Sequence, residues 1–188
     1  MNRHFIKLIG FFVIVNSCGQ VKSDNFIIPN AGIKKINNQY LIDTAVILNN
    51  KNLDTLITQI ENSKLIDKFN VKDIPDFIND FLINATHDNF SIANPGENWQ
   101  STDVIIEELP NRQLIYLGVG ENLIVLAYYS GGIGESEHIL VFRYHDKDII
   151  DFWCGNVLKD VKTKIEILKL LKENKLKHWG LNTNIIYL

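Results

Sequence analysis

Apolar and polar positions along the chain repeat with two different periods. In residues 53–60 the apolar side chains recur at i, i+3, i+4 and i+7, which places them on one face of a helix. The same period recurs over residues 74–85 and 160–174. In the second of these segments Asp73 is a suitable N-cap, and Pro75 lies in the first turn, where its missing N–H costs nothing. The pattern predicts two helices in the first half of the chain and one near its end.

Shorter runs with a period of two, or apolar throughout, predict strands. Residues 39–48 are rich in β-branched and apolar side chains and predict a first strand. Later in the chain, short turn sequences separate five further runs, as expected for the hairpin neighbours of an antiparallel meander. These runs are residues 104–109, 113–119, 123–130, 138–144 and 149–154. The second and third runs are apolar on both faces, so we expect them to be covered on both sides.

These elements predict an α+β fold. We expect an antiparallel β-meander of about five strands, packed with two N-terminal helices and one C-terminal helix. Residues 185–188 could add a short final strand, and whether the sheet extends to that segment or to the Tyr40 strand stays open. The expected organisation is a leader over residues 1–17, a tether over 18–37 and a single domain over 38–188. A domain of about 150 residues can be stable through its core alone.

Composition excludes some classes of protein. Of the 188 residues, 46% are hydrophobic and 22% are charged, which is the balance of a globular protein with a core. The formal net charge is −3, and loss of Arg3 and Lys7 with the first 17 residues would make it two units more negative. Nucleic-acid binding needs clustered Lys and Arg. We therefore expect no nucleic-acid partner.

The first 18 residues have the features of an export signal. Arg3 and Lys7 precede an uncharged apolar run over residues 8–15. This run is too short to span a bilayer, which takes roughly 20 apolar residues, but it suits the core of a signal peptide. A small residue, Ser17, and a cysteine, Cys18, follow directly. The alternative interpretation is a buried apolar N-terminal strand with an incidental cysteine.

Val15-Asn16-Ser17-Cys18 resembles the lipobox of bacterial lipoprotein precursors. That motif places an aliphatic residue three positions before the cysteine and a small residue directly before it, and Asn16 is a less usual occupant of the middle position. The resemblance implies cleavage between Ser17 and Cys18, a thioether-linked diacylglycerol on Cys18 and acylation of the new amino terminus. Two or three acyl chains anchor a protein stably, whereas one does so only marginally. The expected location is the cell envelope, on the periplasmic face or at the outer membrane.

Polar residues next to a glycine-rich turn are the first candidates for a functional surface. The sequence Gly131-Gly132-Ile133-Gly134 joins the third and fourth runs, and Glu135-Ser136-Glu137-His138 follows it. Adjacent strand residues point to opposite faces, so Glu137 and His138 would not converge as an acid–base pair or as metal ligands without a bulge. Loops held by a rigid sheet often make functional contacts, although a solvated hairpin loop is the alternative. The expected partner-contact residues are Gly132, Gly134, Glu135, Glu137 and His138.

Trp99 is a further contact candidate, because it follows the turn sequence at Pro95-Gly96 in a polar connection. An exposed aromatic side chain in a loop can anchor a partner. The five histidines are scattered, without a His-x₃-His or Cys-x₂-Cys spacing. We therefore expect no metal and no other cofactor.

Cys154 is the other cysteine of the chain. If Cys18 carries lipid, Cys154 has no partner for an intramolecular disulfide. It could serve as a nucleophile with His138 or His145 as base and Asn156 as the orienting group. A small apolar side chain packed beside Phe152 and Trp153 is the interpretation we prefer, since free cysteines are among the most buried residues.

Three functions of different classes remain. The first is a lipid-anchored, non-catalytic protein-binding module, of which an immunity or inhibitor protein against a toxin or hydrolase is a sharper version. The second is an envelope assembly or maintenance lipoprotein. The third is an envelope enzyme that depends on Cys154. Binding ranks above catalysis, because no set of residues satisfies the geometry expected of an active site.

Overall fold

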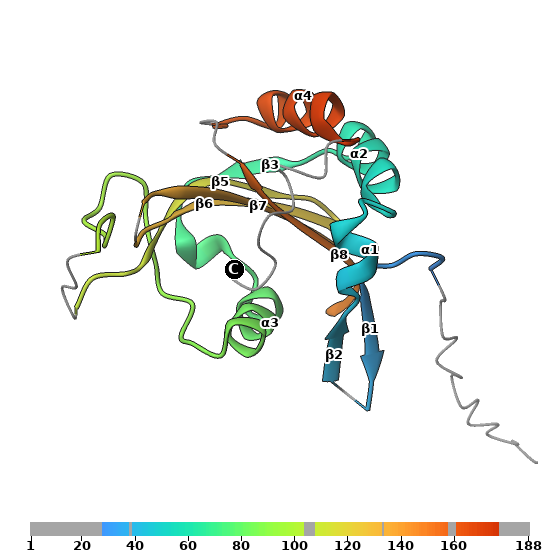
Figure 1. The fold of residues 1–188 in the computed structure, drawn as a ribbon, viewed down its shortest axis with the longest axis horizontal. Helices are drawn as coiled ribbons and strands as arrows, with labels where there is room; N and C mark the ends of the chain where they lie inside the picture. The colour runs from blue at the N-terminus through green and yellow to red at the C-terminus, as the bar shows by residue number, and fades with distance from the viewer. Residues whose placement is uncertain (1–27, 38, 104–107, 133, 158–160, 177–188) are drawn as a thin grey trace, which may run out of the picture.

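The fold is α+β, with helices on both faces of one main sheet and a small hairpin beside it (Figure 1). The computed structural model describes residues 28–37, 39–103, 108–132, 134–157 and 161–176. The main sheet has the strand order β3-β5-β6-β7-β8, and a further short strand, β4, pairs with β5.

Four long strands form the antiparallel meander. They are β5 (Arg112–Val119), β6 (Leu123–Ser130), β7 (Ser136–His145) and β8 (Asp148–Val157). Each pairs antiparallel with its neighbour in the chain, which confirms four of the five predicted meander strands. The fifth prediction, residues 104–109, falls mostly outside the described residues, and the described Glu108 and Leu109 lie in a turn and a bend.

Two short strands of the main sheet were not predicted. β3 (Ile66–Lys68) pairs antiparallel with β5, and β4 (Ile92–Ala93) pairs with it in parallel. Among the described strands, β3 and β8 are therefore the two ends of the main sheet. Segments of two or three residues are too short to show a period.

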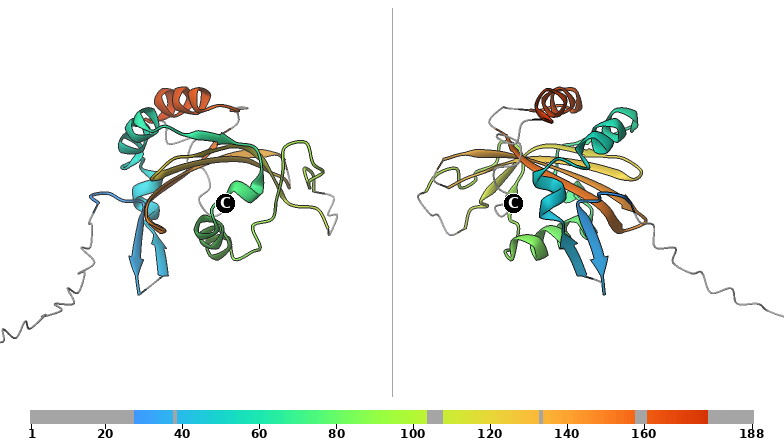
Figure 2. Two further views of the ribbon diagram at one scale, coloured as in Figure 1. Left: turned by 180° about the vertical axis from the view of Figure 1, so that it is seen from behind. Right: turned by 45° about the vertical axis from the view of Figure 1, so that its right-hand side comes forward.

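The predicted helices cover the two faces of the sheet. α2 (Leu53–Asn62) and α4 (Lys164–Asn174) lie on one face, and α3 (Asp76–Thr86) lies on the other, as two further views show (Figure 2). This confirms that the central strands are covered on both sides. We call these faces the α2–α4 face and the α3 face.

Two helix starts differ from the prediction. Asp73 does not cap α3, because it ends the 3₁₀ turn η1 (Val71–Asp73), and the N-cap position belongs to Pro75. α4 begins at Lys164 and not at residue 160. Its N-cap is Thr163, whose Oγ1 accepts a hydrogen bond from the N–H of Glu166 at 3.2 Å.

The N-terminal part departs most from the prediction. The expected strand over residues 39–48 divides into β2 (Gln39–Ile42) and α1 (Thr44–Leu48), because the Asp43 carboxylate accepts a hydrogen bond from the N–H of Val46 and caps a helix. β1 (Ile33–Ile36) pairs antiparallel with β2 and lies inside the expected tether. The folded domain thus begins before residue 38.

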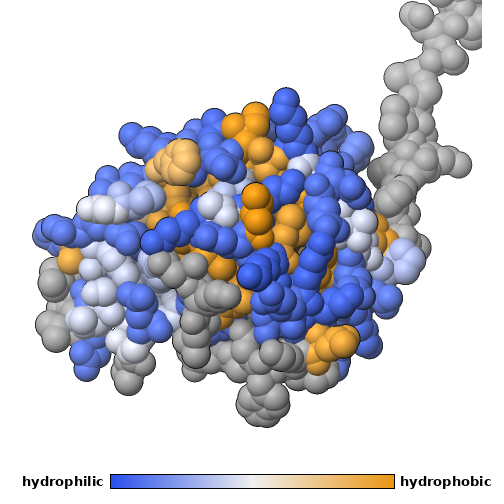
Figure 3. All heavy atoms as spheres, turned by 90° about the horizontal axis from the view of Figure 1, so that it is seen from above, coloured by the Kyte–Doolittle hydropathy of each residue, from blue (hydrophilic) through white to orange (hydrophobic). Residues whose placement is uncertain are grey.

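Aromatic packing forms the core on the α3 face. The ring of Phe81 lies 5.6 Å from that of Phe142 and 5.1 Å from that of Phe152, both in edge-to-face geometry. On the α2–α4 face the indole of Trp153 is fully buried and donates to the side-chain oxygen of Asn50 at 3.1 Å. From above, the surface over α2 and α4 is mostly hydrophilic with apolar patches (Figure 3).

Candidate functional site

Buried polar side chains gather where β6 turns into β7. We call this region the loop end, defined by Arg112, Tyr128–Ser130 and Ser136–His138. Tyr128 pairs with His138 across β6 and β7, and His138 pairs with Asn156 of β8. Paired residues of neighbouring strands share a face of the sheet, so these three side chains lie on the α3 face.

His138 is held between a ring and a hydroxyl. Its imidazole stacks on Tyr128 with centroids 5.1 Å apart and planes 4° from parallel, and its Nε2 lies 2.9 Å from the Ser136 hydroxyl oxygen. The side chain is 3% exposed. Burial and the nearby Arg112 lower the pKa of His138 to about 4. At neutral pH the imidazole is therefore uncharged.

Arg112, at the start of β5, makes two interactions with the segment after α3. Its Nη2 donates to the Asp88 carboxylate at 3.1 Å, and its guanidinium carbon lies 4.3 Å from the centre of the Phe90 ring. Burial alone would raise the pKa of Asp88, but hydrogen bonds from the Phe90 N–H and from Arg112 hold it below its usual value. The result is a charged pair at the edge of the aromatic core.

The contact between Ser136 and His138 has the residue types of a nucleophile and a base. A general base works best when its pKa lies near the operating pH. An imidazole with a pKa near 4, packed under Tyr128, accepts a proton poorly at neutral pH. The pair is therefore suited to a fixed hydrogen bond within the fold and poorly suited to proton abstraction.

Cys154 also lies on the α3 face, two residues along β8 from Asn156, and the structure therefore brings Cys154, Asn156 and His138 to one side of the sheet. Cys154 is 4% exposed, and burial raises the pKa of its thiol. His145 lies at the far end of β7 with its side chain 82% exposed. Because only the thiolate is an effective nucleophile, this environment disfavours Cys154 as a catalytic group.

Glu137 has a structural partner. It is 4% exposed, and its Oε1 accepts a hydrogen bond from the N–H of Val161 at 3.0 Å, just before α4. His138 faces the other way, toward Tyr128. This confirms that the two neighbours point to opposite faces. With both side chains buried, neither contributes an exposed contact surface.

The other predicted contact residues lie around the loop end. The indole of Trp99 is half-buried and stacks on the ring of Tyr129, with centroids 6.0 Å apart. Gly132 and Gly134 have φ angles of +137° and +96°, and Glu135 is exposed. Gly131 lies so close to the loop carrying Trp99 that a Cβ there would stand 1.8 Å from the Gln100 carbonyl oxygen. The two loops therefore form one continuous surface.

The sequence interpretation did not find Asp88, Arg112 or Tyr128 as members of this cluster, although it named Ser136 beside His138. The sequence contains a weak indication of a buried ion pair at Arg112, because a charged residue at the start of an apolar strand needs a partner. Its partner lies 24 residues earlier in the chain. No local pattern connects two positions at that separation.

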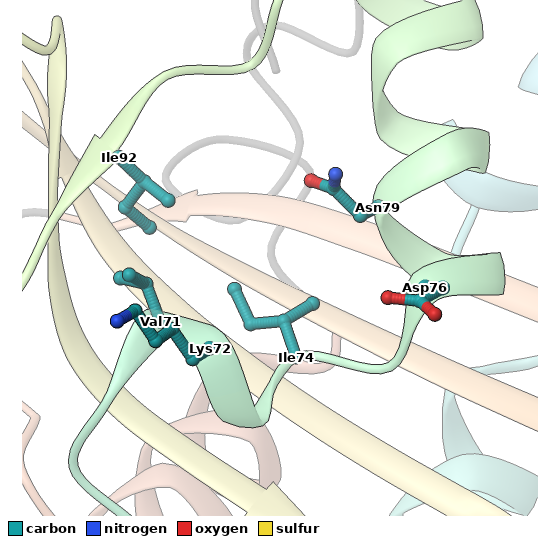
Figure 4. Close-up of a pocket in the computed structure, with 6 residues that line it drawn as sticks. All are labelled: Val71, Lys72, Ile74, Asp76, Asn79 and Ile92. Carbon is teal, nitrogen blue, oxygen red and sulfur yellow. The ribbon is translucent and has the colours of Figure 1, made fainter.

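A hollow away from the loop end lies between η1 and the start of α3, with a volume of about 370 Å³ (Figure 4). Its lining consists of Val71, Lys72, Ile74, Asp76, Asn79 and Ile92. Lys72 and Asp76 are exposed at its rim, so both charges are solvated. The hollow lacks the buried, convergent polar groups that mark a specific ligand site.

Comparisons with protein-family models, with curated proteins and with solved structures find no match to this chain. No helix among the described residues is long and apolar enough to cross a membrane. Within the same residues, no three His, Cys, Asp or Glu side chains are grouped so that they could hold a metal ion. Residues 1–17 and Cys18, where the sequence predicts the leader and the lipid anchor, lie outside the described residues.

Proposed function

We propose that the chain is a non-catalytic, protein-binding lipoprotein of the cell envelope, anchored by lipid on Cys18. The contact surface would be formed by the accessible residues beside the loop end, Trp99 and Glu135. One observation carries the binding role: His138 and Cys154 are buried on the α3 face, where burial lowers the pKa of the imidazole and raises that of the thiol, while Trp99 is half-buried and Glu135 exposed beside the loop end. A rigid meander that presents two fixed loops is a common way to hold a contact surface.

An immunity or inhibitor role is the sharper form of this proposal. The net charge of −3 favours association with a basic enzyme, because opposite charges speed and orient the encounter. An exposed acidic residue, Glu135, lies in the contact surface itself. An envelope anchor would place the inhibitor where an enzyme arriving from outside is first met.

An envelope assembly lipoprotein would use the same surface, and the identity of the partner distinguishes the two. The hypothesis of an envelope enzyme that depends on Cys154 has less support, since burial disfavours the thiolate of this residue. It predicts that Cys154→Ser abolishes an envelope activity while the domain stays folded.

The test is a pull-down of the tagged, membrane-extracted protein, with mass spectrometry of what it retains. We expect one stoichiometric partner, and we expect Cys18→Ser to lose the membrane fraction. Glu135→Lys should reduce the retained partner strongly. Glu121→Lys, the same charge change in the exposed turn between β5 and β6, is the matched control and should not. Absence of a stoichiometric partner, or equal loss in both variants, would contradict the proposal.

A further inference from the structure

The β1–β2 hairpin has one face that belongs to the core and one that does not. On the inner face the ring of Tyr40 packs edge-on against Phe81 with centroids 5.7 Å apart, and its hydroxyl accepts a hydrogen bond from the N–H of Ile149. The register pairs Lys34 with Leu41 and Ile36 with Gln39 on the opposite face. Because residues alternate along a strand, these four side chains point away from the core.

The outer face of the hairpin, defined by Lys34, Ile36, Gln39 and Leu41, is apolar and basic. Ile36 and Leu41 are each 51% exposed. The side chain of Lys34 is 67% exposed, and its Nζ lies 3.3 Å from the Asp43 carboxylate, an exposed ion pair that is weak enough to exchange for a headgroup phosphate. Leu48 of the neighbouring α1 is 40% exposed, and the exposed Lys51 follows that helix. Aliphatic side chains with lysines beside them suit a lipid surface, where the former enter the acyl boundary and the latter meet anionic headgroups.

The position of the hairpin along the chain points to the same surface. Fourteen residues separate Cys18 from Ile33, the first residue of β1, and even fully extended they reach only about 50 Å. The hairpin is the first described element after the proposed anchor. It projects from one end of the molecule, and the loop end lies at the other (Figures 1 and 2).

We propose that the outer face of the hairpin rests on the lipid surface that holds the anchor, with Ile36 and Leu41 at the acyl boundary and Lys34 at anionic headgroups. This inference rests on the proposed function, because it requires lipid on Cys18. Contact at the hairpin fixes the orientation of the domain and directs the loop end away from the membrane. An anchored protein with a fixed orientation presents the same surface to every arriving partner.

The test places a fluorophore at Leu41→Cys in the full lipidated protein. Cys154 is buried and Cys18 would carry lipid, so the introduced thiol is the accessible one. The protein is reconstituted in vesicles of phosphatidylethanolamine and phosphatidylglycerol that contain acyl-chain quenchers. Ile165→Cys, 77% exposed on α4, is the matched control. We expect several-fold stronger quenching at Leu41, which weakens when phosphatidylcholine replaces phosphatidylglycerol or when Ile36→Glu is added.

The outcomes separate the two proposals. Protein that does not float with the vesicles overturns the anchor and this orientation together. Protein that floats but shows equal, weak quenching at both labels overturns the hairpin contact and leaves the anchor intact. A Leu41 label that is shielded from aqueous quenchers only when a protein partner is added would assign the outer face to that partner instead. Circular dichroism of the Ile36→Glu variant checks that lost quenching does not come from unfolding.

Discussion

The two faces of the main sheet hold their covering segments in different ways. On the α3 face, Phe81 packs into the rings of Phe142 and Phe152, so a helix is held by apolar contact. On the α2–α4 face, two buried carboxylates accept hydrogen bonds from backbone N–H groups: Asp151 from Gly32 at 2.8 Å and Glu137 from Val161 at 3.0 Å. Burial of apolar surface is non-directional and suits a regular helix, whereas a carboxylate fixes one N–H at one point. Buried carboxylates therefore position the irregular segments before β1 and α4, whereas burial of apolar surface holds the helix α3.

The largest effect on stability should come from a substitution on the α3 face. Phe81 is 3% exposed and contacts three other rings, so we expect Phe81→Ala to lower the free energy of unfolding by about 3–5 kcal/mol. Phe69→Ala is the matched control, because Phe69 is 72% exposed and its loss should change that free energy by less than about 0.5 kcal/mol. Urea denaturation followed by tryptophan fluorescence measures both. Similar values for the two variants would mean that α3 is not held by this ring.

The next effect depends on pH. The folded-state pKa of His138 is about 4 against an ordinary value of 6.5, so the unfolded chain binds a proton more readily between these values. Stability from this group is present above pH 6.5 and is lost as the pH falls toward 4, by up to about 3 kcal/mol. His138→Phe keeps a ring against Tyr128 but cannot titrate, so its stability should fall less over this range.

Denaturation midpoints from pH 7.5 to 4 check this expectation. His145→Gln, at an exposed turn position, serves as the control and should keep the pH dependence of the unmodified protein. If His138→Phe loses stability with falling pH as steeply as that control, His138 is not the titrating group.

The third and smallest predicted effect tests how much a buried carboxylate contributes to stability. Asp151 Oδ1 accepts hydrogen bonds from the N–H of Gly32, from Asn52 and from the N–H of Phe152, and burial raises the pKa of the carboxyl. Asp151→Ala should cost about 1–3 kcal/mol, because three donors lose their acceptor. Asp151→Asn keeps an acceptor without a buried charge and should cost clearly less at pH 7.5. An equal loss in both variants would show that the negative charge itself holds the segment.

Long periodic segments could be predicted from the sequence, and short or capped ones could not. α2, α3 and the four meander strands extend over 8 to 11 residues, which is enough for a period to stand out. The strand predicted over residues 39–48 was wrong, because one capping side chain, Asp43, starts a helix despite the strand preference of the β-branched residues. At the loop end the sequence indicated His138 but not its stacking on Tyr128, which depends on strand register.

Gly32 bears on how separate copies of the chain behave toward each other. A Cβ at this position would stand 1.9 Å from the carbonyl oxygen of Phe152, so glycine is what lets the incoming chain lie directly against β8. β8 is the last strand of the main sheet, and an uncovered last strand recruits strands from other molecules and starts aggregation. At the opposite edge, β3 offers three residues, one of them Lys68, and β4 offers two, which is too little for a stable foreign strand. One residue without a side chain thus helps to keep neighbouring copies of the chain from joining their sheets.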